Sequence, residues 1–132
     1  MIVSLYDMVK NNIYRIFSII FLFIISYVLV NFYRPFKASN TFNDFGIADS
    51  GSGMISLIIV YLAVSKTKST YTESKNLAIV IFLLYFIQEV LSYFFKSIGT
   101  YDFKDIVYYV LGFIIIYYFD VKGRKKYEDL NI

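Results

Sequence analysis

The chain has 132 residues, of which 58% are hydrophobic and 17% are charged, and its formal net charge is +3. Soluble domains carry about 25% charged residues, and one small core could not bury several long apolar runs, so this composition indicates an integral membrane protein. The chain has no Cys and no His, which excludes disulfides, Ser–His nucleophiles and Cys- or His-based metal sites.

Four apolar segments are predicted to cross the bilayer as helices within a single transmembrane domain, residues 1–132. A helix needs about 20 mostly apolar residues to cross a hydrocarbon core of about 30 Å. The sequence therefore predicts an all-α, four-transmembrane-helix bundle. The predicted spans are 13–33, 45–65, 77–95 and 103–119, followed by a basic tail, 120–132.

The ends of these spans carry most of the polar residues. Arg34-Pro35 is expected to end the first span, because proline cannot donate a backbone hydrogen bond. The second and fourth spans have short apolar centres, which must recruit Asp49 to Gly53 and Asp102 to Asp105. These two polar beginnings suggest irregular backbone lining a polar cavity. A cleaved signal peptide is the alternative for the first run, but no small-residue cleavage site follows it.

The positive-inside rule predicts that both termini are cytoplasmic. This orientation leaves four basic residues outside: Arg34, Lys37, Lys96 and Lys104. It places nine inside: Lys10, Arg15, Lys66, Lys68, Lys75, Lys122, Arg124, Lys125 and Lys126. We therefore expect a multi-pass protein of the cytoplasmic membrane that meets lipid but no nucleic acid. The basic tail could bind anionic headgroups, although a stop-transfer cluster is the simpler interpretation.

The same topology divides the acidic residues into two groups. The expected cytoplasmic group consists of ordinary solvated partners of Lys and Arg: Asp7, Glu73, Asp120, Glu128 and Asp129. The group expected on or toward the outer side is Asp44, Asp49, Glu89, Asp102 and Asp105. Asp49 and Asp105 are expected at the same depth, because each lies near the outer end of a short span.

Glu89 is the most informative of these residues. An ionisable group within a span costs about 2.5–3.5 kcal/mol on insertion scales, so it usually faces the bundle interior or water. Glu89 lies on one helical face with Tyr85 and Ser92. A second face carries Asp102, Asp105, Tyr109 and Gly112, whose missing side chain permits close helix approach. We expect the two faces to meet in an outward-open polar cavity.

Structural roles are the alternative for the same residues. A protonated Glu89 could hydrogen-bond to Tyr109 or to helix backbone. Asp102 could cap the last helix, and Asp105 could be a favourable charge in its first turn. For Asp102 the two interpretations stand about equal, whereas a functional role is favoured for Glu89 and Asp105. No metal or other cofactor is expected, because crowded carboxylates are more easily relieved by protonation or by pairing with Lys or Arg.

The spacing of these residues resembles the C-terminal signature of VanZ-like membrane proteins. That family has an intramembrane Glu, then Asp-x-x-Asp, an Asn four residues on and a Gly three further. Glu89, Asp102, Asp105 and Gly112 correspond to it, with Tyr109 at the Asn position. An earlier family motif, Asp followed four residues later by His-Phe, corresponds to Asp49 without the His. The resemblance covers about residues 44–119.

The resemblance implies a small polytopic protein of the bacterial cytoplasmic membrane. The founding member of the family is associated with teicoplanin resistance, and no enzymatic reaction is firmly assigned to the family. It therefore implies a non-enzymatic cell-envelope protein whose outward acidic pocket meets a cationic or polar ligand or partner and affects antibiotic or toxin sensitivity. The candidate ligand-binding residues are Glu89, Asp105, Asp102, Asp49, Tyr109 and Gly112, with no catalytic residue assigned.

Two other function classes remain open. One is a small subunit or immunity-type protein that acts by helix–helix contact within a larger membrane assembly. The other is an enzyme on a lipid-linked envelope substrate, for which the carboxylates would supply acid–base groups or hold Mg²⁺. Dependence on a divalent metal would favour the enzyme, and one stoichiometric protein partner would favour the subunit.

Overall fold

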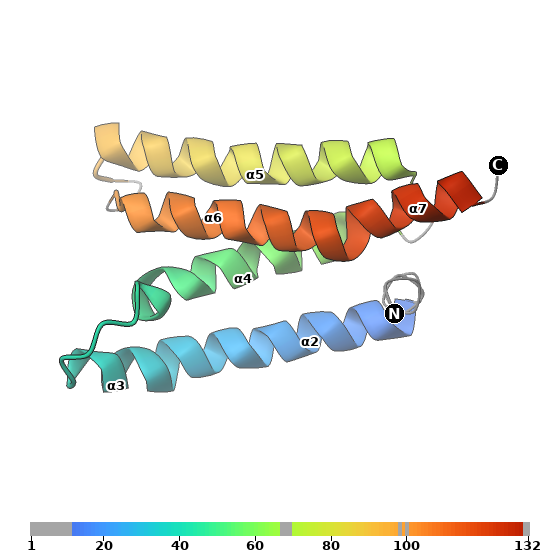
Figure 1. The fold of residues 1–132 in the computed structure, drawn as a ribbon. Helices are drawn as coiled ribbons and strands as arrows, with labels where there is room; N and C mark the ends of the chain where they lie inside the picture. The colour runs from blue at the N-terminus through green and yellow to red at the C-terminus, as the bar shows by residue number, and fades with distance from the viewer. Residues whose placement is uncertain (1–11, 67–69, 98, 100, 131–132) are drawn as a thin grey trace.

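A computed structural model of the chain describes residues 12–66, 70–97, 99 and 101–130. These residues form helices joined by short connections, with no strand among them, which confirms the predicted all-α class (Figure 1). The helices are α2 (Asn12–Val28), η1 (Leu29–Tyr33), α3 (Arg34–Ala38), α4 (Ile47–Val64), α5 (Tyr71–Phe94), α6 (Phe103–Ile116), η2 (Tyr117–Val121) and α7 (Lys122–Leu130).

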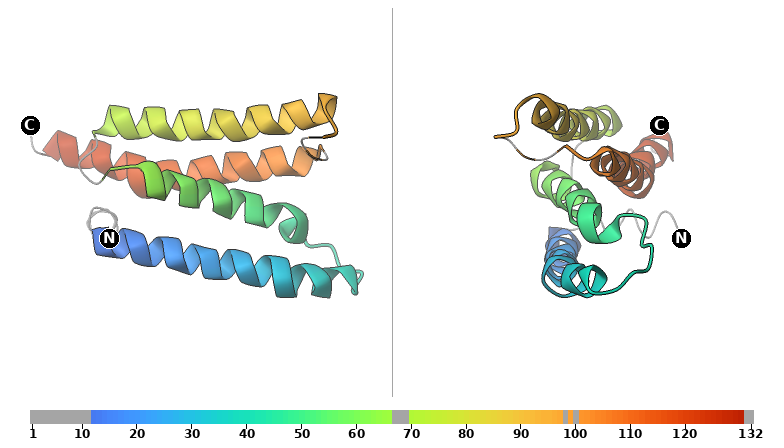
Figure 2. Two further views of the ribbon diagram at one scale, coloured as in Figure 1. Left: turned by 180° about the vertical axis from the view of Figure 1, so that it is seen from behind. Right: turned by 90° about the vertical axis from the view of Figure 1, so that its left-hand side faces the viewer.

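The described helices combine into four segments that are long and apolar enough to cross a membrane. The first joins α2, η1 and α3, and the last joins α6, η2 and α7. All four run roughly alongside one another (Figure 2). Their bounds are Ile13–Ala38, Ile47–Val64, Tyr71–Phe94 and Phe103–Leu130.

Helix α4 occupies the middle of the bundle. It packs against α6 most closely, against α5 on the same side, and against α2 on the other. Among the described helices outside its own segment, α2 packs against α4 alone, so it lies at the edge of the bundle (Figures 1 and 2). The interior therefore forms between α4, α5 and α6. Its buried apolar residues are Leu57, Tyr61, Ala78, Ile81, Tyr109, Ile116 and Val121.

The two ends of the bundle differ in what they contain. One end, here called the terminal end, holds both the start of α2 and the end of α7 (Figure 1). The other, called the distal end, holds α3, the start of α4 and the connection between α5 and α6. Four crossings thus leave the two described chain ends at one side of the bilayer.

The expectation that Arg34-Pro35 ends the first span is wrong. The helix continues to Ala38, with Pro35 in the first turn of α3. The preceding turn, η1, is a π-helix, in which the N–H of Arg34 donates to the carbonyl of Leu29 five residues back. A π turn is wider than an α turn, so it makes room for the proline ring within a continuous helix.

The expectation of irregular backbone in the second and fourth spans is also wrong. Asp49 to Gly53 lie inside α4, which begins at Ile47, and α6 begins at Phe103. Gly51 and Gly53 are both helical residues of α4. Gly53 packs against the ring of Tyr109, where an added Cβ would lie 3.1 Å from a ring carbon. The glycine is therefore a point of close approach between α4 and α6.

The orientation of the bundle stays a prediction, and the absence of Cys from the chain makes it simple to test. We expect Asn40→Cys, at the distal end, to react with a membrane-impermeant maleimide in intact cells. Lys66→Cys, at the terminal end, should react only after permeabilisation, because nine of the thirteen basic residues would then lie inside. Labelling in the reverse order would contradict the predicted orientation.

Candidate functional site

Glu89 lies near the distal end of α5, where its side chain is buried with 7% exposure. Its carboxylate Oε1 accepts the backbone N–H of Asp102 at 2.8 Å. This hydrogen bond joins the last turns of α5 to the residue that starts α6. An acceptor at the end of a long apolar helix thus fixes the connection between the two helices.

The two aspartates at the start of α6 occupy the positions that helix capping predicts. Asp102 is the N-cap, and its Oδ1 accepts the N–H of Lys104 at 3.0 Å. Asp105 lies half-buried in the first turn, where the positive end of the helix dipole favours a carboxylate. Both aspartates lie within electrostatic range of Glu89. The structure therefore brings these three predicted site residues together.

Tyr109 and Gly112 lie deeper in the bundle and serve packing. Tyr109 is buried, and its ring meets that of Tyr85 edge-on at 5.1 Å between centroids. The hydroxyl of Tyr85 hydrogen-bonds to Ser56 on α4 at 2.7 Å. An added Cβ at Gly112 would lie 3.4 Å from the carbonyl oxygen of Met54. These residues set the spacing of α4, α5 and α6 beneath the carboxylates.

Asp49 has a different environment from Glu89. It lies in the first turn of α4 and pairs with Arg34 of α3 across 3.8 Å, and both side chains are 59% exposed. An exposed pair of this kind adds about 0–1 kcal/mol of stability. The structure therefore associates Asp49 with α3 rather than with the hydrogen bond between Glu89 and Asp102.

Asp44 is the remaining acidic residue that was expected on the outer side. Its side chain binds backbone N–H groups at the start of α4. Its carboxylate accepts the N–H groups of Gly46 at 3.1 Å and Ala48 at 2.9 Å. Desolvation alone would raise the pKa of Asp44, but these two donors and nearby Lys37 hold that pKa below its usual value. The carboxylate is thus kept ionised as a helix cap.

An open hollow lies at the distal end, where α5 ends. It is about 490 Å³ in volume. Two of its lining rings, those of Tyr93 and Tyr101, contact each other edge-on, 5.3 Å between centroids. The Ser92 hydroxyl in the lining donates to the backbone carbonyl of Glu89, one turn back along α5. Its lining residues are Ser92, Tyr93, Lys96, Gly99 and Tyr101. None of them was among the predicted site residues, because they converge only through the path of the α5–α6 connection.

The acidic residues do not gather into a metal site within the described part of the chain. No group of three or more carboxylates is arranged to hold an ion there. Glu89 and Asp102 instead bind backbone N–H groups, and Asp49 binds Arg34.

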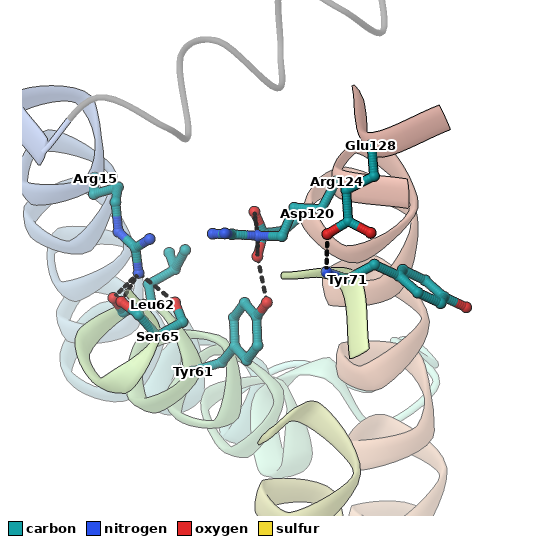
Figure 3. A network of polar contacts seen from close by, with 8 residues as sticks. All are labelled: Arg15, Tyr61, Leu62, Ser65, Tyr71, Asp120, Arg124 and Glu128. Atoms are coloured by element: carbon teal, nitrogen blue, oxygen red, sulfur yellow. Dashed lines mark hydrogen bonds and ion pairs between the residues drawn. The ribbon is translucent and has the colours of Figure 1, made fainter. Parts of the chain in front are cut away.

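The expectation that Asp120 is a solvated partner is wrong, because it is buried at the terminal end with 3% exposure. Its carboxylate accepts Nε of Arg124 at 3.1 Å and the hydroxyl of Tyr61 (Figure 3). Arg124 is itself only 1% exposed. The i, i+4 spacing of Asp120 and Arg124 was a signal for this pair, but their position in a charged tail favoured a solvated interpretation.

The π turn η2 places this pair inside the bundle. The N–H of Lys122 donates to the carbonyl of Tyr117 five residues back. Successive residues of an α-helix point about 100° apart, yet Asp120 and Val121 are both buried. Burial continues past the turn, because α7 starts with Gly123 and Arg124 buried as well.

No family model, curated protein or solved structure matches the chain.

Proposed function

We propose that the protein is a non-enzymatic, VanZ-like protein of the bacterial cell envelope that binds a cationic or polar ligand at the distal end of its bundle. In this proposal the distal end faces outward and both termini are cytoplasmic. Ligand binding there would affect sensitivity to antibiotics or toxins.

The observation that carries this proposal is the hollow at the distal end of α5. Its two tyrosine rings offer faces that attract cations, and the carboxylates of Glu89, Asp102 and Asp105 lie at the same end of the bundle, outside its lining. Lys96 adds a donor in the lining for a polar group. A ligand that carries both a cation and hydrogen-bonding groups matches this mixture best.

Glu89 could also serve only to accept the N–H of Asp102. Two substitutions separate this structural role from a role in ligand binding. Glu89→Gln keeps an oxygen that accepts the Asp102 N–H but removes the charge, so it should fold with nearly wild-type stability. Glu89→Ala removes the acceptor, and loss of a partner for a buried donor costs about 1–3 kcal/mol. Gln88→Ala, at the adjacent exposed position, is the matched control for both.

The measurement combines thermal unfolding in detergent with survival of an expressing host against teicoplanin and a cationic peptide antibiotic. We expect Glu89→Gln to fold normally yet lose most of the wild-type effect on survival. Wild-type survival with Glu89→Gln, together with loss of stability in Glu89→Ala, would show that Glu89 serves only to accept the hydrogen bond from Asp102.

A second candidate function, as a subunit or immunity-type partner in a membrane assembly, is favoured by the exposure of α2. In the most apolar stretch of the first segment, which contains α2, only 6% of the residues are buried within the bundle. The corresponding share for the other three segments is 22–33%. A photo-crosslinking residue at Phe21, which is 62% exposed, would test this candidate. One stoichiometric protein adduct would support it, whereas adducts with lipid alone would contradict it.

A further inference from the structure

A second hollow opens between α2 and α4 at the terminal end. It is about 290 Å³ in volume. Four of its six lining residues are aliphatic, and one guanidinium and one hydroxyl side chain supply the polar part. The lining residues are Arg15, Ile16, Ile19, Leu62, Ala63 and Ser65. An apolar wall with a basic group at the membrane surface suits an amphipathic anion.

Arg15 is anchored within this hollow and retains unused donors. Its Nη2 donates to the carbonyl oxygens of Leu62 and Ser65 and to the Ser65 hydroxyl (Figure 3). The last carbonyls of a helix lack intrahelical donors, so Arg15 caps the end of α4. Nη1 is buried and has no hydrogen-bond partner among the described residues, although the whole side chain is only 5% exposed. A buried charged donor without a partner is costly.

Arg15 belongs to a cluster of three buried charged side chains. Arg15 lies within electrostatic range of Asp120 and Arg124, and these three buried side chains carry two positive charges and one negative. The Asp120 carboxylate is already engaged by Arg124 and Tyr61 (Figure 3). The cluster therefore keeps one positive charge that its own acidic residue does not neutralise.

From these observations we propose that the α2–α4 hollow binds an anionic phospholipid. The lipid phosphate accepts hydrogen bonds from the Arg15 guanidinium and the Ser65 hydroxyl, and the acyl chain lies along Ile16, Ile19 and Ala63. Arginine binds phosphate oxygens with charge-assisted hydrogen bonds. The aliphatic wall selects a lipid over a soluble anion, because inorganic phosphate has no apolar part to bury. This site is independent of the proposed function at the distal end.

Native mass spectrometry and thermal unfolding of the full chain in detergent would test the site. The probes are phosphatidylglycerol, phosphatidylcholine and inorganic phosphate. We expect phosphatidylglycerol to remain bound and to raise the unfolding temperature, with phosphatidylcholine and inorganic phosphate having little effect. Equal effects of the two lipids would overturn the proposal. So would full stabilisation by inorganic phosphate alone, which would indicate a site for a soluble anion.

Two variants locate the site. Arg15→Gln should weaken phosphatidylglycerol binding about tenfold or more, as expected for loss of a charged hydrogen bond. Arg34→Gln, an exposed arginine of the same helical segment at the distal end, is the matched control and should bind normally. Since Arg15→Gln also removes the cap of α4, Ala63→Trp provides a second test. It fills the hollow without changing charge and should displace the lipid. Unchanged binding in Ala63→Trp would overturn the proposal.

Discussion

Asp120→Ala is expected to lower the free energy of unfolding by about 3–5 kcal/mol, because it breaks a buried ion pair by removing its carboxylate. Arg124 is 1% exposed and Tyr61 is fully buried, and both donate to this carboxylate. Removing the carboxylate takes away the acceptor that the guanidinium and the hydroxyl share inside the bundle. Equilibrium unfolding in mixed micelles measures the loss.

The control for this prediction is Asp129→Ala, at an exposed acidic residue of α7, the helix that continues from η2. It should change stability by less than about 0.5 kcal/mol. Replacing both Asp120 and Arg124 by Leu should recover much of the loss, because an apolar pair needs no desolvation of charge. An Asp120→Ala variant as stable as Asp129→Ala would contradict the buried pair.

Gly112→Leu is expected to destabilise the bundle by about 1–3 kcal/mol through overpacking. A Cβ at this position would lie 3.3 Å from Cγ of Met54 and 3.4 Å from both Cδ2 of Leu57 and the Met54 carbonyl oxygen. The Met54 side chain can move, but the backbone carbonyl cannot without shifting α4. The larger side chain must therefore push α4 and α6 apart.

Thermal unfolding in detergent would measure this effect. Val110→Leu is the control, since Val110 lies on the same helix at an exposed position and an added methylene there meets no neighbour in the core. We expect the control to unfold at the wild-type temperature. If Gly112→Leu did the same, the close approach of the two helices would not limit packing.

The four helices were predictable because crossing a bilayer imposes a length and an apolar composition that a sequence displays directly. The predicted start of the last span, Phe103, agrees with the start of α6. The course of the first span was not predictable from Pro35. A proline normally interrupts helical hydrogen bonding, and its tolerance here depends on the π turn before it.

The candidate site was predictable in part: for Glu89, the sequence indicated the environment of the side chain but not its hydrogen-bond partner. The cost of a carboxyl group in a membrane span indicated that it would face the bundle interior or water, and the structure places it in the interior. Its partner is the backbone N–H of Asp102, which is a matter of loop geometry rather than residue type. The burial of Asp120 escaped prediction for a similar reason, because it depends on η2 and on Tyr61 of a distant helix.

The contact between Arg15 and Ser65 joins residues 50 positions apart, which bears on how the bundle is assembled during synthesis. Of the described helices α2 is made first, and its span has the highest mean hydropathy of the four, 2.4, so it can enter the bilayer before its neighbours exist. Until α4 has been completed, Arg15 has no carbonyls to cap and must remain among the lipid headgroups, where its charge is solvated. The arrival of Ser65 then gives it a protein partner, so this one side chain couples docking of the first hairpin to completion of its second helix.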